Sequence, residues 1–321
     1  MPHATPPQVK TAPKTERKGT RKFSDLTPQE RDYVATPSGF AKAVLKMELY
    51  PKQAEIIDSV RFGNSVSAVM CNEYGKTTRC IAALVLHHIV MFPRSSADGG
   101  VIATSGSWNQ VLNQLMPALR AYQDKLPGYT FKEHSIDKGG YPQFLAFSTR
   151  EANRAEGFHG NPANPLMTVL DEWKGIPDDI CFAMQERCNP QRFAGFSSPG
   201  YALGEFYQSH HGKSRFYHQF KAAAARINPN VEGGFELTGD APHISAESIR
   251  KRIEKWGINH PMTRSMIFAE FMDIVQGAMI TAAEIEACIE EPGPYKANGQ
   301  RKAFLDFAAG GDENVIAFRE G

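Results

Sequence analysis

The chain has 321 residues, 41% of them hydrophobic and 22% charged, which is ordinary for a globular protein of about two domains. This composition excludes a disordered, collagen-like or coiled-coil chain, and without a run of about 18 apolar residues no transmembrane helix is expected. Residues 1–7 lack the apolar core of a secretory signal, so we expect a cytoplasmic protein.

The formal net charge of +1 hides an uneven distribution. Residues 1–22 hold six Lys or Arg and one Glu, whereas the rest of the chain holds 30 basic and 34 acidic residues. The Pro- and Thr-rich composition of the basic segment predicts that residues 1–24 form a disordered tail. The tail either contacts a polyanion or serves only to keep the chain soluble.

Ordered structure is expected from residue 27, where Thr27-Pro-Gln-Glu30 has the form of a capping box with proline at the first helical position. Apolar runs typical of strands then alternate with helical segments, which favours a mostly parallel sheet covered by helices on both faces. The expected helices are 38–47, 51–60, 77–92 and 107–124, and the expected strands are 65–70, 100–104, 168–170 and 193–197.

A more helical region is expected over residues 245–289, with Ser245 as its N-cap and a second capping box at 281–284. Pro and Gly residues at 292–299 then predict a linker. The adjacent His87 and His88 have no partners at metal-ligand spacing, so we expect them to be packing or surface residues.

The segment between the first strand and the next helix, Met70-Cys-Asn-Glu-Tyr-Gly-Lys-Thr-Thr78, has the makings of a phosphate-binding loop. Such a loop needs inward-pointing amides, a glycine for close approach, a lysine for the phosphates and a hydroxyl for Mg²⁺. Met70 stands where the usual first glycine would be, and Gly-Lys-Thr is a common tripeptide, so a purely structural turn stays open. The expected nucleotide-binding residues here are Asn72, Glu73, Tyr74, Gly75, Lys76, Thr77 and Thr78.

A second chemical signal, about 95 residues after Lys76, is an apolar strand that ends in Asp171 and Glu172. A strand-end Asp can hold Mg²⁺ in phosphoryl transfer, and a neighbouring carboxylate can act as general base on the attacking water. A buried strand that runs into an acidic helix start would look the same. The order of the loop and the carboxylates favours an ATP- and Mg²⁺-dependent enzyme. Upstream, the amide of Gln53 could read the adenine edge, or Gln53 could be an exposed residue at a helix start.

These motifs, taken together, resemble those of the large terminase subunit of tailed bacteriophages, the motor that packages DNA. Residues 40–321 are similar to that family in the order of their motifs rather than in any single one. The matching segments are Leu49-Tyr-Pro-Lys-Gln53, Cys71-Asn-Glu-Tyr-Gly-Lys-Thr77, Arg154-Ala-Glu-Gly-Phe-His-Gly160, Val169-Leu-Asp-Glu172, Ser197-Ser-Pro-Gly200, Gly204-Glu-Phe206 and Leu305-Asp306.

The resemblance implies an α/β P-loop NTPase of the additional-strand type with a small helical subdomain. It implies that Lys76 and Thr77 bind phosphate and Mg²⁺, that Asp171 holds the metal and that Glu172 is the catalytic base. Ser197 and Ser198 would form a coupling motif that senses the γ-phosphate, although Ser-Ser-Pro-Gly is also typical of an ordinary turn.

The arginine finger of the family is harder to place. His159 stands where the family often has Arg before Gly. Arg154, with Arg150 in reserve, is therefore the candidate for the guanidinium that neutralises charge on the transferring phosphate. A surface arginine paired with carboxylates is the alternative.

The last segment resembles the first hairpin of the RNase H-like nuclease domain that follows the ATPase in terminases, with Asp306 in the place of its first metal ligand. Two-metal hydrolysis needs several converging carboxylates, and the chain ends 15 residues after Asp306, so no nuclease activity is expected from it. The expected domains are a tail (1–24), an ATPase core (25–235), a helical subdomain (236–291), a linker (292–301) and this hairpin (302–321).

The expected function is ATP-driven translocation of double-stranded DNA into a procapsid, in the cytoplasm of the infected host cell. The resemblance implies the small terminase subunit, the portal protein and a homo-oligomeric ring, expected to be a pentamer, as partners. Two alternatives remain open: a structural packaging subunit with little or no ATPase activity, and a helicase-like translocase unrelated to packaging.

Overall fold

The computed structural model describes residues 27, 28, 31, 34–148 and 157–272, together with the main chain of two strands at 301–306 and 315–320. Its centre is an eight-stranded sheet in the order β3-β4-β5-β2-β6-β7-β1-β8. The strands are β1 (Ser65–Met70), β2 (Gly100–Ser105), β3 (Thr130–Phe131), β4 (Ser135–Lys138), β5 (Tyr141–Ala146), β6 (Leu166–Asp171), β7 (Arg192–Ser197) and β8 (His218–Ala222).

The six strands from β5 to β8 in this order run parallel, and β3 and β4 complete one edge with antiparallel pairing. Every residue of β2, β6 and β7 is buried. Strands covered on both faces need apolar side chains on both sides, which is why these segments are nearly continuous apolar runs.

Strand β7 lies between β1 and β6: Val69 pairs with Ser197, and Asp171 pairs with Phe196. A strand inserted between the phosphate-loop strand and the carboxylate strand defines the additional-strand type of P-loop NTPase. The predicted α/β fold class is therefore confirmed.

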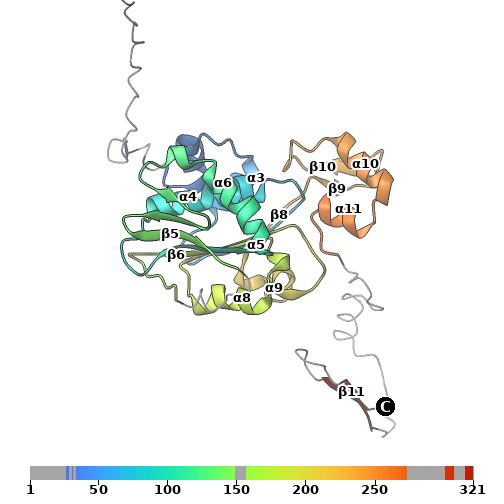
Figure 1. Cartoon of the computed structure of the whole chain (residues 1–321). Helices are drawn as coiled ribbons and strands as arrows, with labels where there is room; N and C mark the ends of the chain where they lie inside the picture. Colours follow the sequence, from blue (N-terminus) through green and yellow to red (C-terminus); the bar gives the residue numbers. More distant parts are fainter. Residues whose placement is uncertain are drawn as a thin grey trace, which may run out of the picture.

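Helices cover both faces of the sheet (Figure 1). In the view of Figure 1, α3, α4 and α6 lie above the sheet, and α8 and α9 lie below it. The helical elements are α2 (Pro37–Phe40), α3 (Pro51–Asp58), α4 (Ala82–Met91), α5 (Trp108–Gln110), α6 (Met116–Arg120), α8 (Asp178–Phe182) and α9 (Gly204–Gln208), with π-helical turns at Ala41–Leu45, Lys76–Ile81, Val111–Leu115 and Ala183–Arg187 and 3₁₀ turns at Gln123–Lys125, Trp173–Gly175 and Ser214–Phe216. The four helices and four strands expected in this region are all present.

The sheet also has four strands that the sequence analysis did not predict: β3, β4, β5 and β8. Strands β4 and β5 form a hairpin in which Lys138 pairs with Tyr141 across Gly139 and Gly140, both with positive φ. A Gly-Gly pair is typical of a hairpin turn, and this signal was present in the sequence. Strand β8 is largely exposed and carries His, Gln and Lys, so it lacks a clear apolar pattern.

A smaller lobe follows β8 and lies beside the sheet (Figure 1), and we call residues 225–272 the lobe. It contains β9 (Ala225–Ile227), β10 (Phe235–Leu237), α10 (Ala246–Trp256) and α11 (Pro261–Met266). The predicted N-cap is present, since the Ser245 hydroxyl accepts a hydrogen bond from the Ser248 amide at 3.2 Å.

Four expected features fall wholly or partly outside the described residues: the basic tail, the capping box at 27–30, the helical region beyond residue 272 with its capping box, and the linker at 292–301. Near the C-terminus, β11 (Arg301–Asp306) pairs antiparallel with β12 (Val315–Glu320), and Asp306 lies opposite Val315. No helix in the described part of the chain is long and apolar enough to cross a membrane.

Trp173, directly after the two carboxylates, is a packing residue. It is 1% exposed, its Nε1 donates to Cys181 Sγ at 3.1 Å, and its ring lies against Phe193 and Phe206. A Cβ on Gly195 of β7 would collide with this ring. Because Gly195 has no side chain, the indole of Trp173 can pack directly against β7. This packing fixes the position of the chain that follows β6.

We expect Gly195→Ala to lower the free energy of unfolding by about 1–3 kcal/mol, because the rigid indole and the buried strand leave no room for a methyl group. Urea unfolding measures the change. Gly212→Ala is the matched control, since an added Cβ there would meet only the flexible end of Gln208. Equal effects of the two substitutions would contradict the packing argument.

The two adjacent histidines of α4 belong to the core. His87 and His88 are 2% and 0% exposed, and the Nδ1 of His88 accepts a hydrogen bond from Arg192 at 3.0 Å. Burial and the nearby Arg192 charge lower the pKa of His87 to about 4 and the pKa of His88 well below its usual value. Both histidines are therefore neutral packing residues at pH 7.

The lowered pKa of His87 predicts that the protein loses stability as the pH falls from about 6.5 to about 4. In this window the unfolded chain binds a proton that the folded chain excludes, which adds about 1.4 kcal/mol per pH unit to the slope of unfolding free energy. His87→Phe keeps a ring beside Phe40. It should lower the slope of unfolding free energy against pH by the amount that corresponds to one proton. Urea unfolding at several pH values tests this, and an unchanged slope would rule it out.

Candidate active site

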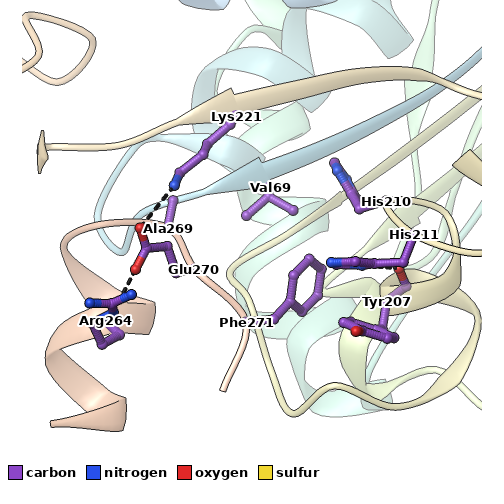
Figure 2. Close-up of a pocket in the computed structure, with 9 residues that line it drawn as sticks. All are labelled: Val69, Tyr207, His210, His211, Lys221, Arg264, Ala269, Glu270 and Phe271. Atoms are coloured by element: carbon purple, nitrogen blue, oxygen red, sulfur yellow. Dashed lines mark hydrogen bonds and ion pairs between the residues drawn. The ribbon is translucent and has the colours of Figure 1, made fainter. Parts of the chain in front are cut away.

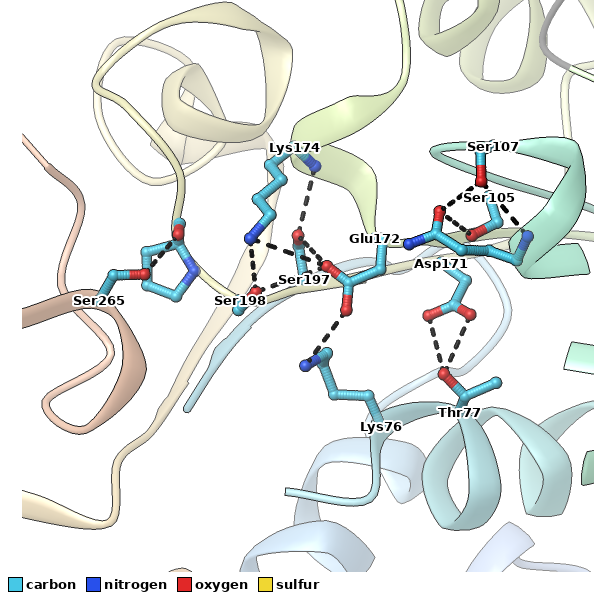
Figure 3. A network of polar contacts seen from close by, with 12 residues as sticks. Lys76, Thr77, Ser105, Ser107, Asp171, Glu172, Lys174, Ser197, Ser198 and Ser265 are labelled. Atoms are coloured by element: carbon cyan, nitrogen blue, oxygen red, sulfur yellow. Dashed lines mark hydrogen bonds and ion pairs between the residues drawn. The ribbon is translucent and has the colours of Figure 1, made fainter. Parts of the chain in front are cut away.

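The carboxyl ends of β1, β7 and β6 meet at one edge of the sheet, where ligands bind in open parallel sheets. Lys76 and Thr77 begin the helical segment after β1, and Asp171 ends β6. The Thr77 hydroxyl donates to both carboxylate oxygens of Asp171, at 3.0 and 3.2 Å (Figure 3). The structure therefore brings together two residues that the sequence separates by 94 positions.

The Asp171 carboxyl is fully buried. Burial, assisted by the adjacent Glu172 charge, raises its pKa to about 7, against the opposing effects of the Thr77 hydrogen bond and the Lys76 charge. A hydroxyl and a carboxylate at hydrogen-bond distance form the hard oxygen set that Mg²⁺ accepts, since this ion keeps several waters and takes only one or two protein ligands. The oxygen atoms of Thr77 and Asp171 are therefore suitable as the predicted Mg²⁺ ligands.

Glu172 lies between the phosphate-loop lysine and the end of β7. Its Oε1 is 3.3 Å from Lys76 Nζ, and its Oε2 accepts from the hydroxyls of Ser197 and Ser198 at 3.4 Å each. The main chain of Glu172 is left-handed, with φ of 50°, a conformation that costs a non-glycine residue about 1–3 kcal/mol and that clusters at functional sites.

The structure adds Lys174 to this group, a residue that the sequence analysis missed. Its Nζ donates to Ser198 Oγ at 2.7 Å and lies 4.0 Å from Glu172 Oε2, while its amide donates to Ser197 Oγ at 3.3 Å (Figure 3). Burial lowers the pKa of Lys174, and the Glu172 charge opposes that shift. A lysine two residues after the carboxylate pair was the available signal.

The loop before Lys76 has the backbone of an anion cradle. Glu73 and Gly75 have φ of 62° and 87°. A Cβ on Gly75 would lie 3.3 Å from both Arg79 and Gln53 side-chain atoms, so the glycine is needed for conformation and for space. Within the described part of the chain, the amides of residues 73–78 have no hydrogen-bond partner, so they are available to a phosphate.

Gln53 lies behind this loop and is fully buried, so the alternative of an exposed helix-start residue is wrong. Its Oε1 accepts from the Tyr50 amide at 3.0 Å, and its Nε2 donates to the Tyr74 carbonyl at 2.8 Å. An adenine contact would have to share or break these hydrogen bonds. Here Gln53 braces the loop.

The remaining predicted site residues differ in their surroundings, and some lie outside the described part of the chain. Asn72 donates its amide to the Met266 carbonyl, Tyr74 is buried with its ring in the core, and Thr78 is exposed. Arg154 and the reserve Arg150 lie outside the described residues, and the side chain of Asp306 is also outside them.

A separate cavity of about 390 Å³ lies where the lobe meets the core (Figure 2). Aromatic rings line one side of it, and Lys221, Glu270 and Arg264 form an ion-paired group on the other. The lining residues are Val69, Tyr207, His210, His211, Lys221, Arg264, Ala269, Glu270 and Phe271. None of the predicted site residues is among them.

Two solved structures with a similar fold are large terminases of bacteriophages. The large terminase of bacteriophage HK97 superposes with a TM-score of 0.56 at 14% identity over 89% of this chain and 64% of its own. The large terminase of a thermophilic bacteriophage, in complex with ADP, has a TM-score of 0.52 at 12% identity over 81% of this chain and 62% of its own.

No family model and no curated protein matches the sequence. The chain spans somewhat less than two thirds of the length of these terminases. At such low identity the similarity shows the fold, and it confirms the resemblance that the order of the motifs predicted. Over most of its length, the chain shares the fold of the matched part of these two bacteriophage large terminases.

Proposed function

We propose that this chain binds and hydrolyses ATP as the motor part of a large terminase subunit. The observation that carries the proposal is the convergence of Lys76, Thr77, Asp171 and Glu172 at the carboxyl edge of one sheet. The terminase fold supports it, as does the ADP complex of the terminase from the thermophilic bacteriophage. This chemistry requires a phosphate cradle, a metal ligand pair and a base, and this edge offers all three.

In this proposal the free amides of residues 73–78 and the ammonium of Lys76 bind the β- and γ-phosphates. Thr77 and Asp171 would hold Mg²⁺, which when bound offsets phosphate charge. The Lys76–Glu172 ion pair must separate as the lysine turns to the phosphates. Its separation leaves the Glu172 carboxylate free to accept a proton.

Glu172 acts as the general base. It accepts a proton from water as the water oxygen bonds to the γ-phosphorus and the bond from phosphorus to the bridging oxygen of ADP breaks. Ser197 and Ser198 hold the Glu172 carboxylate from the end of β7, so loss of the γ-phosphate would change their hydrogen bonds. Lys174, bonded to Ser198, would transmit that change to the segment after β6.

As a motor, the chain would move double-stranded DNA into a procapsid in the cytoplasm of the infected host cell. Backbone-directed contacts are expected, because a translocase must pass over every sequence. The proposed partners are the small terminase subunit, the portal protein and further copies of this chain in a ring, expected to be a pentamer. In such a ring Arg154 is the proposed arginine finger toward a neighbouring site.

We also propose the division into a tail (1–24), an ATPase core (25–235), a helical subdomain (236–291), a linker (292–301) and an RNase H-like hairpin (302–321). In the structure β9 precedes the boundary at 235, and β10 spans it. Strands β11 and β12 fit the hairpin, in which Asp306 is the proposed metal ligand.

Glu172→Gln should lower the steady-state rate of ATP hydrolysis by about 100-fold or more, because the amide cannot accept the proton. Lys76→Ala should in addition weaken nucleotide binding. The measurement uses the full chain with DNA and the small subunit, and Glu186→Gln, an exposed carboxylate away from the site, is the matched control. If the native protein turned over no faster than Glu172→Gln, the chain would be a structural packaging subunit.

Thr77→Val should raise the Mg²⁺ concentration needed for half-maximal ATP hydrolysis by about ten-fold, because valine keeps the volume of threonine but lacks the hydroxyl that faces Asp171. Thr77→Ser retains the hydroxyl and should behave like the native protein. A Mg²⁺ titration of the hydrolysis rate compares the three proteins. Equal midpoints for Val and Ser would remove Thr77 from the metal site.

A further inference from the structure

The first half of the phosphate loop is held by chain that follows β7. The Cys71 amide donates to the Ala222 carbonyl at 2.8 Å, and the Asn72 amide donates to the Met266 carbonyl at 3.0 Å. His243 Nε2 lies at 2.8 Å from the carbonyl of Glu73, to which it donates. Three successive loop residues are therefore held from outside the loop, two of them by the lobe.

The lobe also contacts the side chain of Glu73. A guanidinium nitrogen of Arg252, on α10, lies 2.8 Å from Glu73 Oε1. The Glu73 carboxylate is 64% exposed and the Arg252 side chain 20% exposed. The pair joins the lobe to a loop residue whose main chain is left-handed, and Glu73 therefore receives two lobe contacts, one from His243 and one from Arg252.

A ring contact between the core and the lobe lies beside the Glu73 contacts. The His243 ring stacks on Tyr50 with centroids 5.4 Å apart and planes at 8°, and the Arg79 guanidinium lies 5.0 Å from the Tyr50 centroid. Arg79 donates to the Glu48 carbonyl and Lys76 pairs with Glu172. Among the described residues, Arg252 is thus the cation paired with the Glu73 carboxylate.

A carboxylate in a loop that binds polyphosphate opposes binding, because each like-charge interaction weakens the complex. The Arg252 guanidinium offsets that charge when the lobe contacts the loop, the arrangement that we call the seated lobe. The geometry points to Arg252 and His243 as positioning residues of the nucleotide site: Arg252 neutralises Glu73, and His243 holds the turn at the Glu73 carbonyl. This inference rests on the proposed nucleotide binding, and it means that the loop binds polyphosphate more tightly while the lobe contacts it.

Linkage makes the coupling reciprocal. If a seated lobe favours nucleotide binding, then bound nucleotide favours the seated lobe by the same factor. The Glu73–Arg252 pair would therefore pass occupancy of the site to the lobe by a route separate from Ser197 and Ser198.

The test is a fluorescence titration of the full chain with a fluorescent ADP analogue and Mg²⁺ at low salt. Arg252→Ala should raise the dissociation constant roughly ten-fold. Arg250→Ala removes the same charge from the same helix at an exposed position and should change it by less than about two-fold. Arg252→Lys, which keeps the charge, should retain most of the affinity.

A second variant shows whether Arg252→Ala weakens binding through the loss of its charge or through a loss of folded structure. Adding Glu73→Gln to Arg252→Ala should restore affinity to within about two-fold of the native value, because the repelling charge is gone. Glu73→Gln alone should bind at least as tightly as the native chain. These differences should shrink as salt rises, since both residues are near the surface.

Failure of the inference is distinct from failure of the proposed function. A native chain that does not bind the analogue would overturn both. A native chain that binds, with Arg252→Ala equal to Arg250→Ala or with no rescue by Glu73→Gln, would overturn only the role of Arg252.

Discussion

The hydrogen bond from Thr77 to the buried Asp171 carboxylate is the contact on which the geometry of the candidate site depends. It joins the segment after β1 to the end of β6 across the intervening strand β7. Such a bond can form only if three parallel strands end at one level, and this requires the apolar layers that bury β6 and β7 on both faces. The apolar core therefore holds these two short polar side chains in contact.

The polar side chains around this bond are held in place by further polar contacts. Glu172 leaves β6 in a left-handed turn and is bonded by Lys76 on one side and by the β7 serines on the other. Trp173 anchors that turn in the core, and Gly195 makes room for the indole. The catalytic geometry that we propose thus depends on a tryptophan and a glycine that touch no nucleotide.

Much of the site was predictable from local patterns. An apolar strand followed by Gly-Lys-Thr and a second strand ending in Asp-Glu identify Lys76, Thr77, Asp171 and Glu172, since strand-end positions of a parallel sheet meet at one edge. Gln53 was predicted as an adenine contact or an exposed residue, and neither interpretation foresaw its buried, backbone-bonded amide. Strand β8 and the contacts of Lys174, Arg252 and His243 were missed, because exposed polar residues carry no periodic signal.

By itself the sequence determined the alternation of strands and helices, because this follows from the spacing of apolar residues along the chain. It also determined the order of the chemical motifs, and the resemblance that this order carries indicated the fold class. Only the tertiary structure decided that β7 separates β1 from β6, that Ser197 and Ser198 contact Glu172, and that the lobe reaches Glu73 through Arg252. Those contacts join residues 25 to 179 positions apart, and their free energy depends on strand order and packing rather than on local sequence.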